Sequence, residues 1–405
     1  MTKKITITPS KLSGRTAVPS SKSISHRALI CAALAKGKSK IKHLLDCADT
    51  RATINILESL GAKIYSEDDF TIVEGIKVPS ETAVADCCES GSTLRFLLPV
   101  AAALGCKTEF HGKGKLPERP LTPYFTELTK NGIIFEARSM PYRISGRLCA
   151  GDYSLEGDIS SQFISGLMFA LPILEGDSRL ILTTPLQSKP YVDLTIAELE
   201  KSGIRIDEIP QGYFIKGGQS YAPQKTEIEA DMSQAAFFAV ANAIGSEIEI
   251  EGLNPNSLQG DRAILDIVKN AGGRAFDVDA SQIPDLVPIL TVLASFSEGI
   301  SHITGCGRLR IKECDRLSAI STELNKLGAK VTENKDSLTV EGVKSLNGGI
   351  CDSYNDHRIA MSLAIAAARS KGKVTITGAE CVAKSYPRFF EDFRLLGGIT
   401  DVIIN

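Results

Sequence analysis

Six times along the chain, apolar residues recur at helical spacing, a glycine follows the last turn, and an extended segment comes next. Apolar side chains at every third or fourth position form the buried face of an amphipathic helix. A glycine after the last turn can adopt the left-handed conformation that commonly ends a helix. The six predicted amphipathic helices begin near Thr50, Thr122, Tyr191, Asp261, Asp315 and Tyr386. Most copies lie roughly 70 residues apart, with a shorter interval between the fourth and the fifth, which indicates one supersecondary unit repeated six times.

A second helix, apolar on nearly all sides, precedes each amphipathic one, and this pattern is typical of a helix buried in a core. These helices begin near Lys22, Ser90, Ser160, Met232, Pro284 and Asn355. Strands joined through helices predict an α/β protein. Six units divide into two lobes of three, with the main boundary near residue 225. The opening strand, residues 5–8, belongs to no complete unit and must pair elsewhere.

Composition restricts the class of protein. The 405 residues are 43% hydrophobic and 23% charged, as in an ordinary globular protein. No apolar run reaches the roughly 18 residues of a membrane span, and the first residues lack the apolar core of a signal peptide. A formal charge of −2 gives no indication of nucleic-acid binding. The cysteines are scattered and lie mostly in apolar patterns, as at Cys31, Cys106 and Cys149, so we expect buried free thiols in a reducing cytoplasm.

The starts of the apolar helices carry the candidate chemistry, because a helix N-terminus offers free N–H groups and a positive dipole end to an anion. The residues of N-cap type at these starts are Ser21, Ser23, Ser90, Ser92, Ser160, Ser161, Ser233, Asp285 and Asp356. Any one of them can be explained as a cap alone. However, Lys22 and Arg27 flank the first of these starts, Arg95 follows the second by one turn, and Arg358 opens the sixth helix. A cation there opposes the helix dipole unless an anion balances it.

Further cations lie in loops at matching positions of the repeats: Arg119, Lys312, Arg316 and Lys384. Each could be a solvated surface charge. Together, in a chain of near-zero net charge, they predict a cleft that holds more than one anionic group. Carboxylates also lie among these cations. Asp285 could be a helix cap and Glu313, beside Lys312, a surface ion pair, but with Asp315 they also provide the groups needed to move protons.

The sequence lacks the motifs of several other kinds of functional site. The chain has no phosphate-binding loop of the G-x-x-x-x-G-K-[ST] type, no G-x-S-x-G nucleophile turn, and no His or Cys spacing typical of zinc. The GKGK segment at Gly112 is not a dinucleotide-binding motif because no helix directly follows it. We therefore expect no metal and no cofactor.

Eight segments, in order along essentially the whole chain, resemble the 5-enolpyruvylshikimate-3-phosphate synthase family. They are SKSISHRALICAALA, SGSTLRFLLPVAAALG, ERPLTP, SSQFISGL, SKPYVDLT, RIKECDRL, NDHRIAMSLAIA and CVAKSYPRFF. The resemblance implies two lobes of three βαβαββ repeats, six repeats in all, with helix N-termini facing the interlobe cleft. It implies an N-terminal lobe of residues 15–227 and a C-terminal lobe of residues 1–14 plus 228–405, which contains the opening strand.

The implied reaction transfers the enolpyruvyl group of phosphoenolpyruvate to the 5-hydroxyl of shikimate 3-phosphate, on the shikimate pathway to chorismate and aromatic amino acids. The resemblance implies that shikimate 3-phosphate is bound by Lys22, Ser23, Arg27, Ser160, Ser161, Gln162, Ser188, Tyr191, Asp285 and Lys312. It implies that phosphoenolpyruvate is bound by Lys22, Gly91, Arg119, Gln162, Arg316, Arg358 and Lys384. Asp285 accepts the hydroxyl proton, and Glu313 with Lys22 delivers one to the methylene carbon. We expect a cytoplasmic monomer that binds no nucleic acid and no membrane.

Three positions depart from the family pattern: Glu89 and Ser92 replace the usual Asn and Thr, and Arg308 replaces a frequent Asn. The resemblance also makes the chain an expected glyphosate target, with the phosphonate at Gly91. One alternative is the related transferase that acts on UDP-N-acetylglucosamine, which typically has a reactive Cys in the loop before the Arg-Pro pair. The loop here, HGKGKLPERP, has none. A second alternative is a non-catalytic anion-binding module, in which Asp285 and Glu313 would only repel the ligand.

Overall fold

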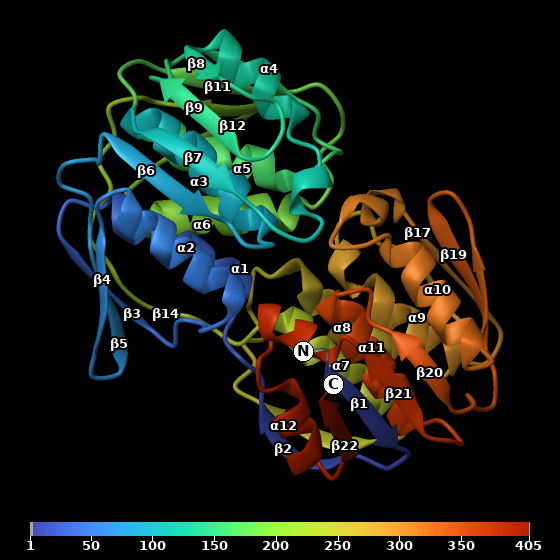
Figure 1. Ribbon diagram of the computed structural model, residues 1–405. Helices are drawn as coiled ribbons and strands as arrows, with labels where there is room; N and C mark the ends of the chain where they lie inside the picture. Colours follow the sequence, from blue (N-terminus) through green and yellow to red (C-terminus); the bar gives the residue numbers. More distant parts are fainter. Residues whose placement is uncertain (1–2, 405) are drawn as a thin grey trace. The chain divides into compact units, whose positions relative to one another are not determined.

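The computed structural model describes residues 3–404 and divides the chain into two compact units (Figure 1). One, here called the central unit, is Ser20–Glu229. The other, the split unit, combines Met1–Pro19 with Ala230–Asn405. Each unit has its own hydrophobic core.

The central unit contains three repeats of two helices and a four-stranded sheet. Its sheets are β14(Lys225–Glu227)-β3(Lys38–Lys42)-β5(Phe70–Glu74)-β4(Lys63–Glu67), β6(Thr82–Asp86)-β7(Lys107–His111)-β9(Tyr142–Gly146)-β8(Ile133–Phe135) and β10(Asp152–Leu155)-β11(Ser178–Leu182)-β13(Gly212–Ile215)-β12(Ile206–Ile209). The apolar helices are α1(Lys22–Leu34), α3(Gly91–Leu104) and α5(Ser161–Ala170). The amphipathic helices are α2(Ala48–Ser59), α4(Thr122–Lys130) and α6(Lys189–Lys201), and the 3₁₀ turns are η1(Leu116–Glu118) and η2(Leu171–Ile173).

The split unit repeats this plan. Its sheets are β20(Gly349–Asp352)-β21(Val374–Thr377)-β1(Lys3–Thr8)-β22(Ile399–Ile404), β16(Asp277–Asp279)-β17(Ile300–Thr304)-β19(Ser337–Glu341)-β18(Lys330–Glu333) and the pair β15(Glu247–Glu251)-β2(Ser13–Ala17). The apolar helices are α7(Met232–Ala243), α9(Val287–Ser295) and α11(His357–Ala368), and the amphipathic ones are α8(Ala263–Ala271), α10(Arg316–Lys326) and α12(Phe389–Leu395). The 3₁₀ segments are η3(Gly260–Arg262), η4(Pro284–Leu286), η5(Gly307–Ile311) and η6(Ala379–Lys384).

All five four-stranded sheets share one topology: the first two strands are parallel, and the third is antiparallel to both the second and the fourth. The fourth repeat has only the parallel pair β2 and β15, so its chain passes from α8 directly to β16 of the next repeat. This missing hairpin explains the short interval in the sequence. The predicted six-repeat α/β architecture is confirmed.

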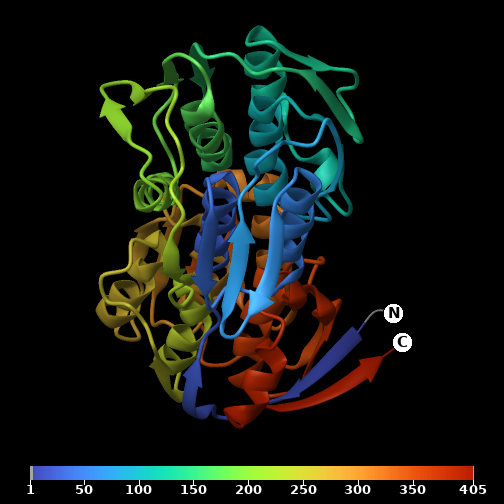
Figure 2. The same cartoon turned by 90° about the vertical axis from the view of Figure 1, so that its left-hand side faces the viewer.

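The opening strand completes the last sheet of the split unit. β1 lies between β21 and β22, where Ile5 is paired with Ile376 on one side and Val402 on the other. Figure 2 shows β1 and β22 side by side, with both chain ends at the same edge of the unit. The first strand therefore pairs with the end of the chain rather than with its neighbours in sequence, as expected.

The predicted helix types and helix ends are also confirmed. Nearly every residue of α3 and α11 is buried, whereas α2 and α10 are buried along one face. The glycines after the six amphipathic helices all have positive φ: Gly61, Gly132, Gly203, Gly272, Gly328 and Gly397. These backbone conformations are unfavourable for residues with a Cβ, which is why glycine ends each helix.

The ten cysteines are free, as expected. Seven of them are buried and Cys88 and Cys314 are half-buried, but Cys149, expected to be buried, is exposed. Cys149 lies between β9 and β10, at a loop position that the apolar residues around it do not cover. Among residues 3–404, none of the helices has the length and apolar character needed to cross a membrane.

Candidate active site

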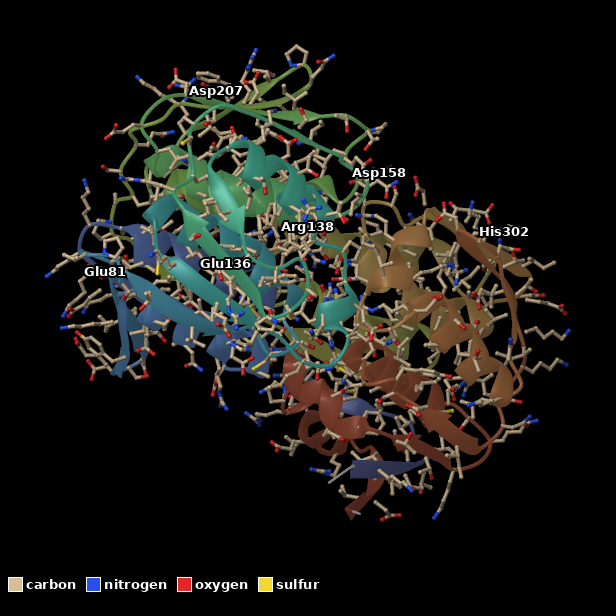
Figure 3. All side chains as sticks on the ribbon, turned by 45° about the horizontal axis from the view of Figure 1, so that its top comes forward. Glu81, Glu136, Arg138, Asp158, Asp207 and His302 are labelled. Atoms are coloured by element: carbon tan, nitrogen blue, oxygen red, sulfur yellow. The ribbon has the colours of Figure 1, made fainter. Side chains whose placement is uncertain are left out.

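Most charged side chains lie at the surface, as Glu81, Glu136 and His302 do (Figure 3). The arginines singled out in the sequence differ from these, because each is less than one-tenth exposed: Arg27, Arg95, Arg119, Arg316 and Arg358. A fully hydrated surface charge is therefore the wrong interpretation for all five. Lys22, Lys312 and Lys384 are half-buried.

In the central unit, the first turn of α1 holds Lys22 against a carboxylate. Ser21 caps the helix, its side chain accepting from the N–H of Ile24. Lys22 Nζ donates to Asp49 Oδ2 at 2.9 Å, and Asp49 lies in the first turn of α2. The cation that opposes the α1 dipole is thus balanced by an acid from the neighbouring helix. Ser23 follows directly, and its carbonyl accepts from Arg27.

Arg27 links α1 to α6. Its Nε donates to Thr195 Oγ1 at 2.8 Å and its Nη2 to the carbonyl of Tyr191 at 2.8 Å. Its guanidinium also lies 5.1 Å from the centre of the Phe96 ring. Burial lowers the pKa of Arg27 to about 10, which still leaves it charged at neutral pH. A buried cation held by carbonyl and hydroxyl groups is well suited to attract an anion.

Gly91 is the first residue of α3, and Ser90 caps that helix. A Cβ at Gly91 would lie 2.8 Å from the Cζ, Nη1 and Nη2 atoms of Arg119. The guanidinium of Arg119 therefore covers the start of α3, so a helix N-terminus and a cation converge on one point. Glu89 turns away toward the next loop: a Cβ at Gly114 would lie 2.5 Å from Glu89 Oε2.

Gln162 is fixed from both ends of its amide. Its Nε2 donates to Ser92 Oγ at 2.9 Å, and its Oε1 accepts from Arg95 Nη1 at 2.8 Å. Arg95 also donates to the carbonyl of Pro120, next to Arg119. The sequence marks Arg95 as a cation near a helix start but indicates no role for it. The structure assigns it the orientation of Gln162, a partner 67 residues away.

The remaining candidates of this unit lie at the starts of α5 and α6. Ser160 caps α5 and accepts from Gln162 N at 3.3 Å, and Ser161 follows it in the first turn. Ser188 precedes α6 in a left-handed conformation with φ 56°, and its side chain makes no capping hydrogen bond. The carbonyl of Ser188 accepts from Tyr191 N at 3.1 Å. The predicted residues of the central unit thus lie at four helix starts and beside Arg119.

In the split unit, Arg316 is the centre of an ion-pair network. Its Nη1 donates to Asp285 Oδ1 at 2.9 Å, its Nη2 to Glu313 Oε2 at 2.8 Å, and its Nε to Asp356 Oδ2 at 2.7 Å. Arg316 is the first residue of α10 and not a loop residue, because Asp315 caps that helix at Ser318 N. Asp315 therefore has a structural role, contrary to its inclusion among proton-moving groups.

Asp285 contacts a second cation. Arg358, in the first turn of α11, donates from Nη2 to Asp285 Oδ2 at 2.8 Å and from Nη1 to its carbonyl at 3.2 Å. The Asp285 side chain makes no cap for α9; it lies in η4 before that helix, so the cap interpretation is wrong. Partial burial alone would raise the pKa of Asp285, but Arg358, Lys312 and Arg316 hold it well below its usual value.

Sequence reasoning missed two buried acids of this network. Asp356 was identified only as a cap type; it caps α11 at Arg358 N and also accepts from Arg316. Asp261, in η3, was named only as the start of an amphipathic helix and not as a site residue. It accepts from the Ser233 hydroxyl, and burial together with the charge of Asp285 raises its pKa to about 7. The cap of α7 is Asp231 and not Ser233. No local signal marks Asp261, because its partners come from distant segments.

Two further cations flank the network. Lys384, at the end of η6, donates to the carbonyl of Asn355 at 2.6 Å, just before α11. Lys312 follows η5 and acts electrostatically on Asp285. Arg308, the departure from the family pattern, donates to the carbonyl of Ser281 at 2.7 Å.

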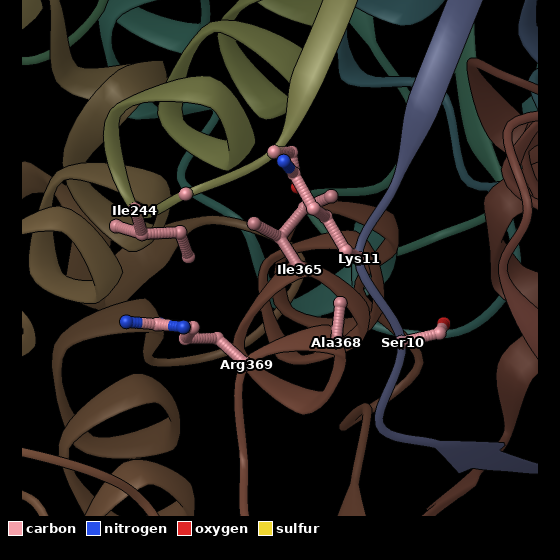
Figure 4. Close-up of a pocket in the computed structure, with 8 residues that line it drawn as sticks. Ser10, Lys11, Ile244, Ile365, Ala368 and Arg369 are labelled. Carbon is pink, nitrogen blue, oxygen red and sulfur yellow. The ribbon is translucent and has the colours of Figure 1, made fainter.

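Other possible sites do not include these residues. A cavity of about 100 Å³ in the split unit is lined by Lys11, Ile244, Ile365 and Arg369 among others (Figure 4), and none of the predicted site residues lines it. Within residues 3–404, no group of three or more His, Cys, Asp or Glu side chains is arranged to hold a metal ion.

Comparison with known proteins gives one consistent family. Residues 7–276 and 272–393 match the family model described as EPSP synthase (3-phosphoshikimate 1-carboxyvinyltransferase). A 3-phosphoshikimate 1-carboxyvinyltransferase of Clostridium perfringens is 46% identical, over 98% of this chain and 99% of its own. That of Clostridium acetobutylicum is 47% identical, over 97% of each chain. An EPSP synthase structure from Acinetobacter baumannii matches with a TM-score of 0.82 and 25% identity, over 99% of this chain and 100% of its own.

Proposed function

Because this chain belongs to the EPSP synthase family of 3-phosphoshikimate 1-carboxyvinyltransferases, we propose that it transfers the enolpyruvyl group of phosphoenolpyruvate to the 5-hydroxyl of shikimate 3-phosphate. The products are 5-enolpyruvylshikimate 3-phosphate and inorganic phosphate. The chain is a transferase; the acceptor position and the mechanism are our proposal.

The proposed mechanism is addition followed by elimination. The 5-hydroxyl oxygen attacks C2 of phosphoenolpyruvate while Asp285 accepts the hydroxyl proton. Glu313, with Lys22, delivers a proton to the methylene carbon, which gives a tetrahedral intermediate. Loss of a proton from the resulting methyl group then restores the double bond, and the C–O bond to phosphate breaks. No phosphoryl group is transferred to an acceptor, so these steps require only acid–base and electrostatic groups of the protein.

The observation that carries this proposal is the contact of Arg316 with both Asp285 and Glu313. It joins the proposed base and the proposed acid through one guanidinium. Planar Arg groups bind carboxylates in forked geometry, and Arg358 lies beside Arg316 on the same acid. We propose that these two arginines bind the carboxylate of phosphoenolpyruvate.

At this proposed site the protein's own acid competes with the substrate for the two arginines. Asp285 accepts from both of them. A substrate carboxylate that takes over these donors would leave Asp285 with fewer cationic contacts. Since those cations lower the pKa of Asp285, losing them raises it and makes Asp285 a better base. Phosphoenolpyruvate would thus activate the base as it binds.

The proposed binding sets are those implied by the family resemblance. For shikimate 3-phosphate they are Lys22, Ser23, Arg27, Ser160, Ser161, Gln162, Ser188, Tyr191, Asp285 and Lys312. For phosphoenolpyruvate they are Lys22, Gly91, Arg119, Gln162, Arg316, Arg358 and Lys384. The phosphate end of phosphoenolpyruvate is assigned to Gly91 and Arg119, where a helix N-terminus meets a buried guanidinium.

All proposed residues belong to one chain, so a monomer suffices for the reaction, and size-exclusion chromatography with light scattering tests this. Free thiols at the ten cysteines are consistent with the reducing cytoplasm that we propose as its location.

A phosphate-release assay tests the function. Phosphoenolpyruvate with shikimate 3-phosphate should give stoichiometric phosphate and 5-enolpyruvylshikimate 3-phosphate, identified by mass spectrometry. The same assay with UDP-N-acetylglucosamine serves as the control for the related transferase. Turnover only with the nucleotide sugar, or with neither acceptor, would refute the proposal.

A further inference from the structure

A chain of hydrogen bonds in the central unit connects α1 to the start of α3 through buried side chains. His26, on α1, is 1% exposed, and its Nδ1 lies 2.8 Å from Thr53 Oγ1 on α2. Thr53 Oγ1 lies 2.8 Å from Thr93 Oγ1 on α3. Thr93 Oγ1 donates to Ser90 Oγ at 2.7 Å. Both threonines are fully buried, so no solvent competes for these bonds.

The proton count fixes the direction of this chain, because each hydroxyl has one proton to donate. The one proton of Thr93 is donated to Ser90 Oγ or to the Asp49 carbonyl, so in either case Thr93 must accept from Thr53. Thr53 has then used its proton and must accept from His26. The imidazole therefore has its proton on Nδ1, which leaves Nε2 as a bare acceptor. Nε2 is buried and has no hydrogen-bond partner among the described residues.

The surroundings of His26 keep the ring neutral. Burial, Lys22 and Arg27 all lower the pKa of His26 well below its usual value. A second ring proton on Nε2 would put a charge next to these two cations without a partner to receive it. A neutral, Nδ1-protonated imidazole is thus the form that the packing requires.

The far end of the chain lies at the proposed phosphate position. Ser90 caps α3, accepting from Thr93 N at 3.2 Å, and the next residue is Gly91 under Arg119. The Thr93 hydroxyl can also donate to the carbonyl of Asp49 at 3.3 Å, and Asp49 is the residue that pairs with Lys22. Thr93 therefore contacts both the cap of α3 and the residue that pairs with Lys22.

We propose that His26 is a positioning residue for this reaction. Through Thr53 and Thr93 it fixes the cap of α3, and so holds the N–H groups at Gly91 in place for the phosphate of phosphoenolpyruvate. His26 itself touches no reacting atom. The inference rests on the proposed function, since it assigns a role within the proposed phosphoenolpyruvate site.

Two substitutions separate this role from simple packing. In His26→Asn, the side-chain amide can place an N–H where Nδ1 lies and can still donate to Thr53. In His26→Leu, the volume is largely kept but the donor is lost. With shikimate 3-phosphate saturating, we expect His26→Leu to raise KM for phosphoenolpyruvate at least tenfold. KM for shikimate 3-phosphate should change less than threefold, and His26→Asn should stay within threefold of wild type in both.

Thr53→Val tests the same chain at its middle and changes the volume little. It should reproduce the KM effect of His26→Leu, and the double variant should be no worse than either single one, because one broken link already disconnects the chain. Thr291→Val is the matched control. The hydroxyl of Thr291 is equally buried but donates only to the Val287 carbonyl of its own helix, so this variant should lose stability and keep both KM values.

The tautomer gives a readout that needs no turnover. Long-range ¹H–¹⁵N NMR should show His26 with a protonated Nδ1 and a bare Nε2 between pH 6 and pH 8, an interval in which an ordinary histidine titrates. The opposite tautomer, a phosphoenolpyruvate KM within twofold of wild type in both His26→Leu and Thr53→Val, or a His26→Asn no better than His26→Leu would each overturn the inference. If the wild type turns over and the variants keep its KM values, the role of His26 is wrong but the proposed function stands. If the wild type shows no turnover, the proposed function itself is refuted.

Discussion

Asp285 Oδ1 accepts a hydrogen bond from Arg316 Nη1 at 2.9 Å, and the Arg316 side chain is only 2% exposed. The pair joins a group suited to accept a proton with a group suited to bind a carboxylate. Burial alone would lower the pKa of Arg316, but Asp356, Glu313 and Asp285 together raise it well above its usual value. Arg316 therefore stays charged whatever binds to it, and the exchange of its anionic partners is the step that a ligand can control.

Amide substitutions of the proposed acid and base test the mechanism. Asp285→Asn and Glu313→Gln should each lower kcat by about 10²–10⁴, because proton transfer by a positioned group contributes this much. KM for phosphoenolpyruvate should not rise in Asp285→Asn, since the variant removes an acid that competes for Arg316 and Arg358. Steady-state kinetics with both substrates measures this. Near-full activity in Asp285→Asn would exclude Asp285 as the base.

Stability should depend on pH through Asp261. Its folded-state pKa is raised to about 7, above the pKa of Asp261 in the unfolded chain, so protonation of this carboxyl favours the folded state. This contribution to the unfolding free energy is fully present below the unfolded-state pKa and is lost as pH rises toward 7. Relative to Asp261→Asn, which cannot titrate, the wild type should lose about 2–3 kcal/mol of unfolding free energy between pH 5 and pH 7. Urea unfolding at several pH values measures the difference. A difference that stays constant with pH would contradict this prediction.

Asp356→Asn should destabilise the protein by about 3–5 kcal/mol, because it leaves a buried arginine without one of its carboxylates. Asp356 is fully buried and contacts both Arg316 and the N–H of Arg358. The matched control is Glu341→Gln, which removes the ion pair of Glu341 with Lys330 at the surface, where both side chains are more than half exposed. Such a pair is worth about 1 kcal/mol or less. Equal losses in the two variants would count against the network.

Gly91→Ala should weaken glyphosate inhibition at least tenfold, about 1.4 kcal/mol, if the phosphonate binds at the start of α3. The new Cβ would lie 2.8 Å from the guanidinium of Arg119, so Arg119 must shift. KM for phosphoenolpyruvate should therefore rise as well, but less than the inhibition constant, because the phosphonate ligand is longer. An inhibition constant equal to that of the parent enzyme would show that the phosphonate binds elsewhere.

Activity should survive treatment with a small epoxide phosphonate, the reagent that alkylates the loop thiol of the related transferase. The loop at residues 111–120 has no Cys. Two thiols border it: the N–H of Cys87 donates to the His111 carbonyl, and the carbonyl of Cys88 accepts from Lys113 N. Burial and Asp86 raise the pKa of both thiols. A thiol that stays protonated is a poor nucleophile. Mass spectrometry should find no adduct; exposed Cys149, labelled by a general thiol reagent, is the positive control. Stoichiometric labelling with loss of turnover would refute this prediction.

The repeat, the helix types and the helix ends could all be predicted from the sequence. These features depend on residues close together in the chain: apolar side chains three or four apart, and a glycine where φ must be positive. The same local pattern located the cations at helix starts. The local pattern did not predict that Cys149 is exposed, because the burial of a loop residue depends on which other segments pack against it.

Which polar groups contact one another depends on the three-dimensional packing and could not be predicted from the sequence. Arg95 reaches Gln162 across 67 residues, Arg316 reaches Asp356 across 40, and His26 reaches Thr53 across 27. Asp261 gives no local signal, yet it lies beside Asp285 in the fold. A side chain's partners, and with them its pKa, are set by the packing of separate helices. Sequence periodicity determines which face of a helix is buried; it does not determine which polar atoms of other helices that face will contact.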